Sequence, residues 1–425
     1  MTLGQIVEAL SDGPLGLRFT AYDGSSAGPA DAPIGLHLAS PRGTTYLATA
    51  PTDPDLGMAR AYISGDLTLS GVHPGDPYEA LVAMADGMKL HRPPALSLAS
   101  IMRSLGWETL RPVAPPPQEA LPKWRRAAHG LRHSKTRDAE AIHSHYDVSN
   151  AFYEHVLGDS MTYTCAYYSS VDASVGQAQE DKYQLVFDKL GLKAGDRLLD
   201  VGCGWGGMVR FAARRGVHAI GATLSKEQAD WARAAIEREG LGDLAEVRHS
   251  DYRDVTETGF TAVSSIGLTE HIGIAQYPAY FRFIMGKLAP GGRLLNHCIT
   301  RPGNDRRTMT GSFIDRYVFP DGELIGSGTI IAAIQDAGLE VRHEENLREH
   351  YALTLRDWCA NLVANWDACV AEVGESTAKL WGLYMAGSRL GFDRNVVQLH
   401  QVLAVKLTAT GDAQVPLRQW WGAGV

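Results

Sequence analysis

The sequence lacks any uninterrupted run of about 20 apolar residues, which is the length that a helix needs to cross a bilayer. It also lacks a secretory leader pattern, because its first residues, MTLGQIVEALSDG, contain no basic stretch followed by an apolar one. These two absences argue against an integral membrane protein and against a secreted one. We therefore expect a cytoplasmic location.

Cysteine is scarce, with five residues spread widely along the chain and no CxxC pair. This distribution argues against a zinc ribbon and against a disulfide framework. It suits a reducing cytoplasm, and we expect no metal site.

Positive charge is also in short supply. The chain has 40 Lys and Arg against 48 Asp and Glu, which gives a net charge of −8. A strongly basic nucleic-acid binder is therefore disfavoured, and we expect no nucleic-acid partner. With 45% hydrophobic and 21% charged residues, the composition is that of an ordinary globular protein, which excludes overall disorder.

One segment reverses this charge balance. Residues 123–137, KWRRAAHGLRHSKTR, contain six Lys or Arg and no acidic residue. Two interpretations stay open: a solvated linker or helix face, and a contact with an anionic lipid surface, where each basic residue contributes about 1 kcal/mol. In the second case the protein associates peripherally with the inner face of the membrane.

The length of 425 residues predicts two or three domains. The composition changes at three consecutive prolines, 115–117, which make a stiff and extended boundary. We expect a small, lipid- or membrane-associated α+β domain over 1–113, a proline-basic linker over 114–139 and a catalytic domain over 140–425.

The large C-terminal part alternates between strand-like apolar runs and segments with helical periodicity. Such alternation predicts an α/β fold with a doubly wound, mostly parallel sheet. The predicted strands are 197–203, 217–225, 245–251, 260–268, 293–300 and 396–407, and the predicted helices are 208–216, 226–240 and 277–292.

Glycine is abundant, with 45 residues, and four of them lie in the segment DVGCGWGG at 200–207. This segment follows an apolar strand and opens a helix, so its backbone can approach a ligand closely. It fits GxGxxG, which dinucleotide-binding proteins use, and also GxGxG, which S-adenosylmethionine enzymes use. The dinucleotide interpretation needs an acid at the end of the next strand, but residues 221–225 are GATLS. An NAD enzyme is therefore disfavoured, although a purely structural turn stays open.

The chain resembles the cyclopropane-fatty-acid synthases and the related mycolic-acid methyltransferases. The segments that carry the resemblance are HYDVSNAFYEHVLGDSMTYTCAYY (145–168), LLDVGCGWGG (198–207), TLSKEQ (223–228), DYRDV (251–255), IGLTEHIG (266–273), LNHCIT (295–300), FIDRYVFPDGEL (313–324) and LREHYALTL (347–355). A weaker match, AYISGDLTLSG (61–71), is similar to the extra N-terminal domain of the full-length synthases.

The resemblance implies a class I methyltransferase fold, Rossmann-like, with a mostly parallel seven-stranded sheet and S-adenosyl-L-methionine (SAM) as cosubstrate. It also implies which residues bind that cosubstrate. These are Tyr163 and Thr164 at the methionine carboxylate, Asp200, Gly202 and Gly204 along the methionine, Thr223 and Gln228 at the ribose, and Tyr252 and Arg253 beside the adenine.

The resemblance further implies methyl transfer to a cis double bond of an unsaturated acyl chain, esterified in phospholipid. Bound bicarbonate then serves as the base that removes a proton from the transferred methyl group. Its expected ligands are Glu270, His297 and Tyr351, with the backbone amides of Cys165 and Ile299. Bicarbonate can accept hydrogen bonds from these donors and donate its own to Glu270, which relieves the repulsion between two anions.

Several alternatives stay open. Thr269 stands where the ring-forming enzymes usually carry an aromatic residue, so the product is either a cyclopropane or a 10-methylene or 10-methyl chain of the tuberculostearic type. A nucleic-acid methyltransferase would share the glycine turn, and a non-catalytic lipid-binding protein could share the scaffold. A homodimer is also left open.

Two further expectations concern the covering of the site. His145, Tyr146 and Asp147 are expected to order a lid over the cofactor rather than to do chemistry. The segment 301–325 coincides with a substrate lid in the family, and its aromatic residues Phe313, Tyr317 and Phe319 could line an acyl channel or pack as ordinary core.

Overall fold

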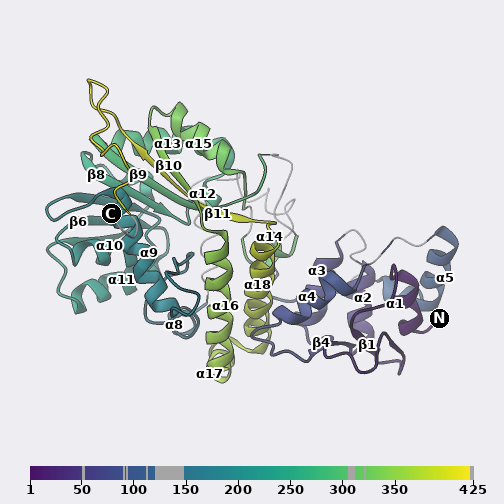
Figure 1. Cartoon of the computed structure of the whole chain (residues 1–425). Coiled ribbons are helices and arrows are strands. Elements are labelled where there is room, and N and C mark those ends of the chain that lie inside the picture. The colour runs from purple at the N-terminus through teal and green to yellow at the C-terminus, as the bar shows by residue number, and fades with distance from the viewer. Residues whose placement is uncertain are drawn as a thin grey trace. The chain divides into compact units, whose positions relative to one another are not determined.

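In the computed structural model, the described residues are 1–49, 53–89, 91, 94–111, 113–119, 148–304, 312–319 and 322–421 (Figure 1). The chain forms two compact units. Unit 1 comprises Met1–Leu121, Gly311–Pro320 and Trp358–Leu390, and unit 2 comprises Pro122–Thr310, Asp321–Asp357 and Gly391–Val425. Each unit is described by itself below.

Unit 2 is built on a seven-stranded sheet of order β10-β11-β9-β8-β5-β6-β7 (Figure 1). Strands β5 to β9 pair in parallel, whereas β11 runs antiparallel to both β9 and β10. The strands are β5 (Arg197–Val201), β6 (His218–Thr223), β7 (Ala245–His249), β8 (Phe260–Ile266), β9 (Leu288–Thr300), β10 (Glu340–Asn346) and β11 (Gln398–Val405). The predicted α/β fold with a mostly parallel sheet is confirmed.

The strand sequences explain why both faces of this sheet are covered. Successive side chains of a strand point to opposite faces, and here both positions are apolar. Leu198 packs in a cluster with α9, α10 and α11, whereas the adjacent Leu199 packs in a second cluster with α13 and α15. The pair Leu295 and Leu294 on β9 is divided in the same way.

The helices of unit 2 follow the strands, as the alternating pattern predicted. They are α8 (Asn150–Leu157), α9 (Val175–Leu190), α10 (Gly207–Ala213), α11 (Lys226–Arg238), η3 (Tyr252–Asp254), α12 (Thr269–Ile272), η4 (Ile274–Gln276), α13 (Tyr277–Lys287) and α15 (Ser327–Asp336). Helix α9 begins at the capping residue Ser174, whose side chain accepts from the Gln177 amide, and ends at Gly191 in the left-handed conformation.

Strand β10 was not among the strands predicted from the sequence. Its sequence, EVRHEEN, is mostly polar, and its burial alternates between half-buried and exposed positions. A strand at the edge of a sheet can expose much of its surface, so it lacks the apolar run by which the other strands were recognised.

Unit 1 contains a four-stranded sheet of order β2-β1-β3-β4 and several short helices. The strands are β1 (Arg18–Ala21), β2 (Ser26–Ala27), β3 (Gly35–Leu38) and β4 (Leu67–Ser70). The helices are α1 (Leu3–Leu10), α2 (Pro41–Thr49), α3 (Pro54–Ile63), α4 (Tyr78–Gly87), α5 (Ala95–Leu105), η1 (Trp107–Leu110), α14 (Ser312–Tyr317) and α17 (Trp366–Val373). A small α+β unit was predicted at this end of the chain.

The compact units divide the chain differently from the predicted boundary near residue 113. Unit 1 also takes in 311–320 and 358–390, and the division falls within helices α16 (Arg348–Ala364) and α18 (Glu375–Asp393). Glu119, expected in the linker, is buried in unit 1 and receives two hydrogen bonds of 2.6 Å from Arg60. The basic segment 123–137 lies outside the described residues.

Across the described ranges, none of the helices combines the length and the apolar character that a membrane crossing requires.

Candidate active site

The glycine turn lies between β5 and α10. Gly202, Gly204 and Gly206 all have positive φ, at 76°, 54° and 73°, a region that residues with a Cβ atom seldom adopt. A Cβ built on Gly204 would meet none of the described residues within 4 Å, so their packing does not account for a glycine there. Open space beside a strained turn at the end of a parallel strand is what a ligand at this edge requires.

Asp200 ends β5 next to this turn and is buried. Burial raises the pKa of its carboxyl to about 6, although a hydrogen bond of 2.6 Å from Ser264 Oγ opposes the shift. Ser264 lies on the neighbouring strand β8, where it pairs with Asp200 in register. The carboxylate is thus held rigidly where it can accept a hydrogen bond from a cationic ligand.

The loop with Tyr163 and Thr164 is held by α9. The Nζ atom of Lys182, which is completely buried, donates to Thr164 Oγ1 over 3.0 Å. Burial lowers the pKa of Lys182 to about 7. Gln179, also completely buried, donates to the Thr164 carbonyl over 2.9 Å.

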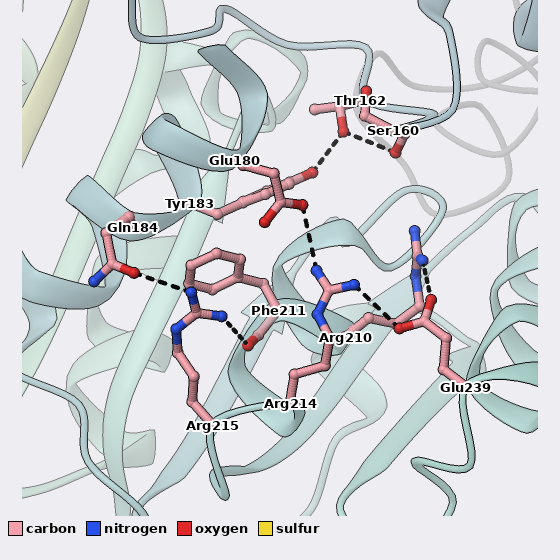
Figure 2. A network of polar contacts seen from close by, with 10 residues as sticks. All are labelled: Ser160, Thr162, Glu180, Tyr183, Gln184, Arg210, Phe211, Arg214, Arg215 and Glu239. Carbon is pink, nitrogen blue, oxygen red and sulfur yellow. Dashed lines mark hydrogen bonds and ion pairs between the residues drawn. The ribbon is translucent and has the colours of Figure 1, made fainter. Parts of the chain in front are cut away.

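The same loop is anchored a second time through Tyr183. Its hydroxyl lies 2.7 Å from Thr162 Oγ1. Figure 2 shows this pair beside a set of ion pairs, which connect α9 to the end of α10 and α10 to the end of α11. Arg214 of this network contacts Glu180 at 3.3 Å and Glu239 at 3.2 Å.

Gly207 brings the glycine turn against α9. A Cβ at Gly207 would lie 1.9 Å from the Tyr183 hydroxyl, so only glycine fits at this point. Tyr183 therefore joins the 162–164 loop to the glycine turn, and the two predicted parts of the cofactor site are brought together.

The predicted ribose residues also meet. Thr223 ends β6, and its Oγ1 donates to Gln228 Oε1 over 2.9 Å. Gln228 lies in the first turn of α11, and its backbone amide donates to the capping residue Ser225 at Oγ over 3.2 Å. This contact turns the amide oxygen of Gln228 toward Thr223 and leaves its NH₂ group as the donor for another partner.

Tyr252 and Arg253, predicted beside the adenine, lie in η3 after β7. The ring of Tyr252 packs edge-on against Tyr280 at 5.4 Å and Phe283 at 5.2 Å. Arg253 is held by Asp251 through contacts of 2.7 and 2.5 Å. The hydrogen-bonding capacity of this guanidinium is thus used in part within the loop itself.

Glu270 lies in the short helix α12, which follows β8, and its side chain turns toward β9. The Ile299 amide donates to Glu270 Oε1 over 2.7 Å. Burial raises the pKa of Glu270 to about 7, and the Ile299 hydrogen bond opposes this shift. The Ile299 amide, expected to contact an anion directly, here binds the glutamate instead.

His297 lies on β9, two residues before Ile299, and is completely buried. Burial lowers the pKa of its imidazole well below the usual value, with further lowering by the positive charges of Lys182 and Lys189, so the ring is neutral. Within the described ranges, His297 Nε2 and Glu270 Oε2 are both buried without a hydrogen-bond partner. Buried polar atoms of this kind are rare and call for a partner that the protein itself does not supply.

Cys165 directs its sulfur to the backbone. The thiol donates to the Ala166 carbonyl at 3.2 Å and to the Leu347 carbonyl at 3.8 Å. Burial raises its pKa strongly, so it stays protonated and is a poor nucleophile. The structure offers no use for a thiolate at this position.

Tyr351 lies in the first turns of α16 and is buried. Its amide donates over 3.2 Å to the Leu347 carbonyl, which also accepts the Cys165 thiol. Its ring packs on Phe392 with centroids 4.5 Å apart. The Cys165 thiol and the Tyr351 amide thus donate to the same backbone carbonyl, that of Leu347.

Thr269 is completely buried, and its hydroxyl donates to Asn296 Oδ1 over 2.5 Å. Tyr317 and Phe319 contact other residues of unit 1, because Tyr317 donates to Glu119 over 3.0 Å and Phe319 packs against Tyr384 at 6.0 Å. His145, Tyr146 and Asp147 lie outside the described residues.

Two residues of the site, Lys182 and Ser264, were not predicted from the sequence. Ser264 is one polar residue in an apolar strand, and Lys182 lies four residues after the buried Ala178 on the apolar side of α9. A lysine in phase with buried residues of a helix is a signal that periodicity could have shown.

The sheet order, the glycine turn after β5 and the polar residues at the ends of β5 and β6 define a class I SAM-dependent methyltransferase. The predicted fold and cosubstrate are confirmed. Residues 133–402 match the family described as mycolic acid cyclopropane synthetase, and the chain belongs to this family.

The relatives agree with this assignment. A probable fatty acid methyltransferase of Mycobacterium tuberculosis is 64% identical over 99% of this chain and 98% of its own length. The tuberculostearic acid methyltransferase UfaA1 of the same organism is 33% identical over 71% of this chain and 70% of its own. The solved mycolic acid cyclopropane synthase CmaA1, in complex with SAH and CTAB, is 30% identical with a TM-score of 0.59, covering 63% of this chain and 97% of that one.

Proposed function

We propose that this enzyme transfers the methyl group of SAM to a cis double bond in an unsaturated acyl chain of a phospholipid and forms a cyclopropane ring. The observation that carries the proposal concerns two buried atoms, Glu270 Oε2 and His297 Nε2, which have no hydrogen-bond partner in the part of the chain that the structure describes. The relatives support the acyl substrate, since one is named as a probable fatty acid methyltransferase and another as a tuberculostearic acid methyltransferase, and the CmaA1 structure is a complex with SAH and CTAB.

The residues fit the chemistry of this transfer. An alkene is a weak nucleophile, so the reacting carbon must be held close to the sulfonium methyl in a dry site. As the carbon–carbon bond forms, the S–CH₃ bond breaks and leaves S-adenosylhomocysteine and a carbocation. Loss of a proton from the transferred methyl group then closes the ring.

Glu270 and His297 also fit a bound bicarbonate ion, which would supply the base for this proton. The neutral imidazole of His297 can donate one hydrogen bond to such an anion, and the second oxygen of Glu270 can accept one from its hydroxyl. Glu270 would in addition place its carboxylate near the developing positive charge. Tyr351 and the Cys165 amide remain proposed ligands of the same ion.

A second product is favoured by one relative and one residue. UfaA1 is named as a tuberculostearic acid methyltransferase, and Thr269 gives this chain a small, hydrogen-bonded side chain before Glu270. A hydride shift followed by proton loss would give a 10-methylene chain, the precursor of a 10-methyl one.

One experiment separates these outcomes. The protein is incubated with labelled SAM and oleoyl phospholipid, and the released acids are analysed by mass spectrometry and proton NMR. We expect a mass gain of one CH₂ and upfield cyclopropane protons, whereas new terminal =CH₂ protons, distinct from the internal CH=CH protons of the oleoyl substrate, would assign the methylene product. No mass gain on any unsaturated lipid contradicts the proposed function, and activity independent of added bicarbonate contradicts the proposed base.

Peripheral association with the inner face of the membrane is proposed on the basic segment 123–137. Replacing Arg125, Arg126 and Arg132 by neutral residues should weaken sedimentation with anionic vesicles and leave the weak interaction with neutral vesicles unchanged. Equal binding of the parent chain and the variant to anionic vesicles would refute this assignment.

A further inference from the structure

His297 belongs to a line of polar side chains on three neighbouring strands, of which two side chains are buried and one is half-buried. Glu345 of β10, Gln401 of β11 and His297 of β9 are cross-strand partners in register. Gln401 and His297 are completely buried. Polar residues at such positions need partners, and their partners lie in this line and on α9.

Lys189 of α9 reaches this line from outside the sheet. Its side chain is completely buried, and its Nζ forms an ion pair with Glu345 and donates to Gln401 Oε1 over 2.6 Å. Burial lowers the pKa of Lys189, and the ion pair with Glu345 opposes this shift. Paired with that carboxylate as an ammonium, Lys189 only donates hydrogen bonds.

The contact with Lys189 determines the orientation of the Gln401 amide. A donor requires an acceptor, so the oxygen of this amide faces Lys189 and its NH₂ group faces the other way. That NH₂ group lies 3.1 Å from His297 Nδ1. An NH₂ group can only donate, so Nδ1 must carry the lone pair that accepts.

A neutral imidazole has a single N–H group, and with Nδ1 as acceptor this group must be Nε2–H. Nε2 is the atom of His297 that is buried without a partner in the described part of the chain. A lone pair at this position would be available to take up a proton, whereas an N–H group can only give a hydrogen bond.

We propose that Lys189 and Gln401 are positioning residues that hold His297 in its Nε2–H tautomer, so that this histidine is a hydrogen-bond donor to an anion and not the base of the reaction. The inference rests on the proposed function for the identity of the anion. The tautomer itself follows from the four side chains.

The tautomer can be measured directly in the full-length protein. Histidine labelled with ¹⁵N is incorporated, and long-range ¹H–¹⁵N spectra are recorded from pH 6 to pH 8; the signals that disappear in His297→Gln identify His297 among the 15 histidines. We expect a protonated Nε2 and an unprotonated Nδ1 throughout. An Nδ1–H tautomer or a doubly protonated ring in the unmodified chain overturns the inference.

The substitution Gln401→Glu replaces the NH₂ group that faces His297 Nδ1 with a carboxylate oxygen, which can only accept hydrogen bonds. The new carboxylate would accept from Lys189 and from His297 together, so Nδ1 becomes protonated and its ¹⁵N signal moves accordingly. Gln398→Glu is the matched control, because Gln398 lies on the same strand, is half-buried, and donates its side-chain hydrogen bond to Asn395 over 2.7 Å, away from Lys189 and His297 in the sequence of the strand. It should leave the His297 signals unchanged.

Activity gives a second readout. A wrong tautomer at an active-site histidine lowers kcat by up to about 10⁴-fold, so we expect Gln401→Glu to lower kcat at least about a hundredfold with the KM for SAM nearly unchanged. An unchanged His297 tautomer in Gln401→Glu overturns the inference. A confirmed Nε2–H tautomer without CH₂ transfer to any lipid overturns the proposed function and leaves the tautomer assignment standing.

Discussion

The ammonium group of Lys182 donates to the hydroxyl of Thr164 over 3.0 Å, from a position that is completely buried. Burial lowers the pKa of Lys182 to about 7, and in its charged form the group can only donate. The Thr164 hydroxyl then accepts, and its own hydrogen can point at another acceptor. The carboxylate of the methionine part of SAM is such an acceptor. A buried lysine thus sets the direction of a hydroxyl in the proposed cofactor site.

We predict that Lys182→Met weakens the binding of S-adenosylhomocysteine about tenfold, the loss of roughly one hydrogen bond to a charged group. The variant should remain folded, since methionine fills a similar volume without a buried charge. Titration calorimetry measures the Kd, and Lys193→Met, at an exposed lysine, is the control. An unchanged Kd would show that Lys182 serves the packing of α9 alone.

The second prediction concerns the pH dependence of stability at Glu270. Its pKa rises from 4.5 in the unfolded chain to about 7 when buried, so the folded state holds this proton more tightly. The associated stabilisation is complete below pH 4.5 and is lost as the pH rises through 7, an effect of about 3 kcal/mol.

Glu270→Gln removes this titration. The stability of the variant relative to the parent chain should therefore increase steadily from pH 5 to pH 8 in urea unfolding. Asp200 also titrates in this range, but it is present in both proteins and cancels in the difference. Glu237→Gln on the exposed side of α11 should give a difference that does not change with pH, and the same flat result for Glu270→Gln would contradict the prediction.

The third prediction concerns the sulfur of Cys165. Its thiol donates to the backbone carbonyls of Ala166 and Leu347 and its pKa is raised by burial, so we expect the sulfur to have no part in the chemistry. Cys165→Ala should retain appreciable methyl transfer, whereas Glu270→Gln should lose most of it. A loss in Cys165→Ala as large as in Glu270→Gln, measured with labelled SAM, would contradict a backbone role for residue 165.

The fourth prediction separates a ligand-bound glycine from a structural one. Gly204 and Gly240 both have positive φ, 54° and 66°, and a Cβ on either would meet no atom of the described residues within 4 Å. Alanine at each should therefore cost a similar 1–2 kcal/mol or so of stability. Only Gly204→Ala should also weaken S-adenosylhomocysteine binding, by tenfold or more; equal affinities in the two variants would show that no ligand approaches Gly204.

The central fold could be predicted because its signals are local. Strands β5 and β9 carry apolar residues on both faces, and the glycines at 202–207 indicate a turn whose backbone conformation few other residues adopt. Strand β10 was missed, because a half-exposed edge strand has no such pattern. The division of the chain was also beyond local reasoning, since α14 and α17 join the N-terminal elements from positions far along the sequence.

By itself, the sequence determined the class of fold, the cosubstrate and the family, because a ligand-binding turn and alternating buried strands leave a pattern in consecutive residues. Only the tertiary structure decided which hydrogen bonds the site residues make with one another. The Ile299 amide is bound to Glu270, and Lys189 acts on His297 through Gln401, although these residues are far apart in the chain. Hydrogen-bond direction depends on which donor meets which acceptor in space, and sequence spacing does not contain that information.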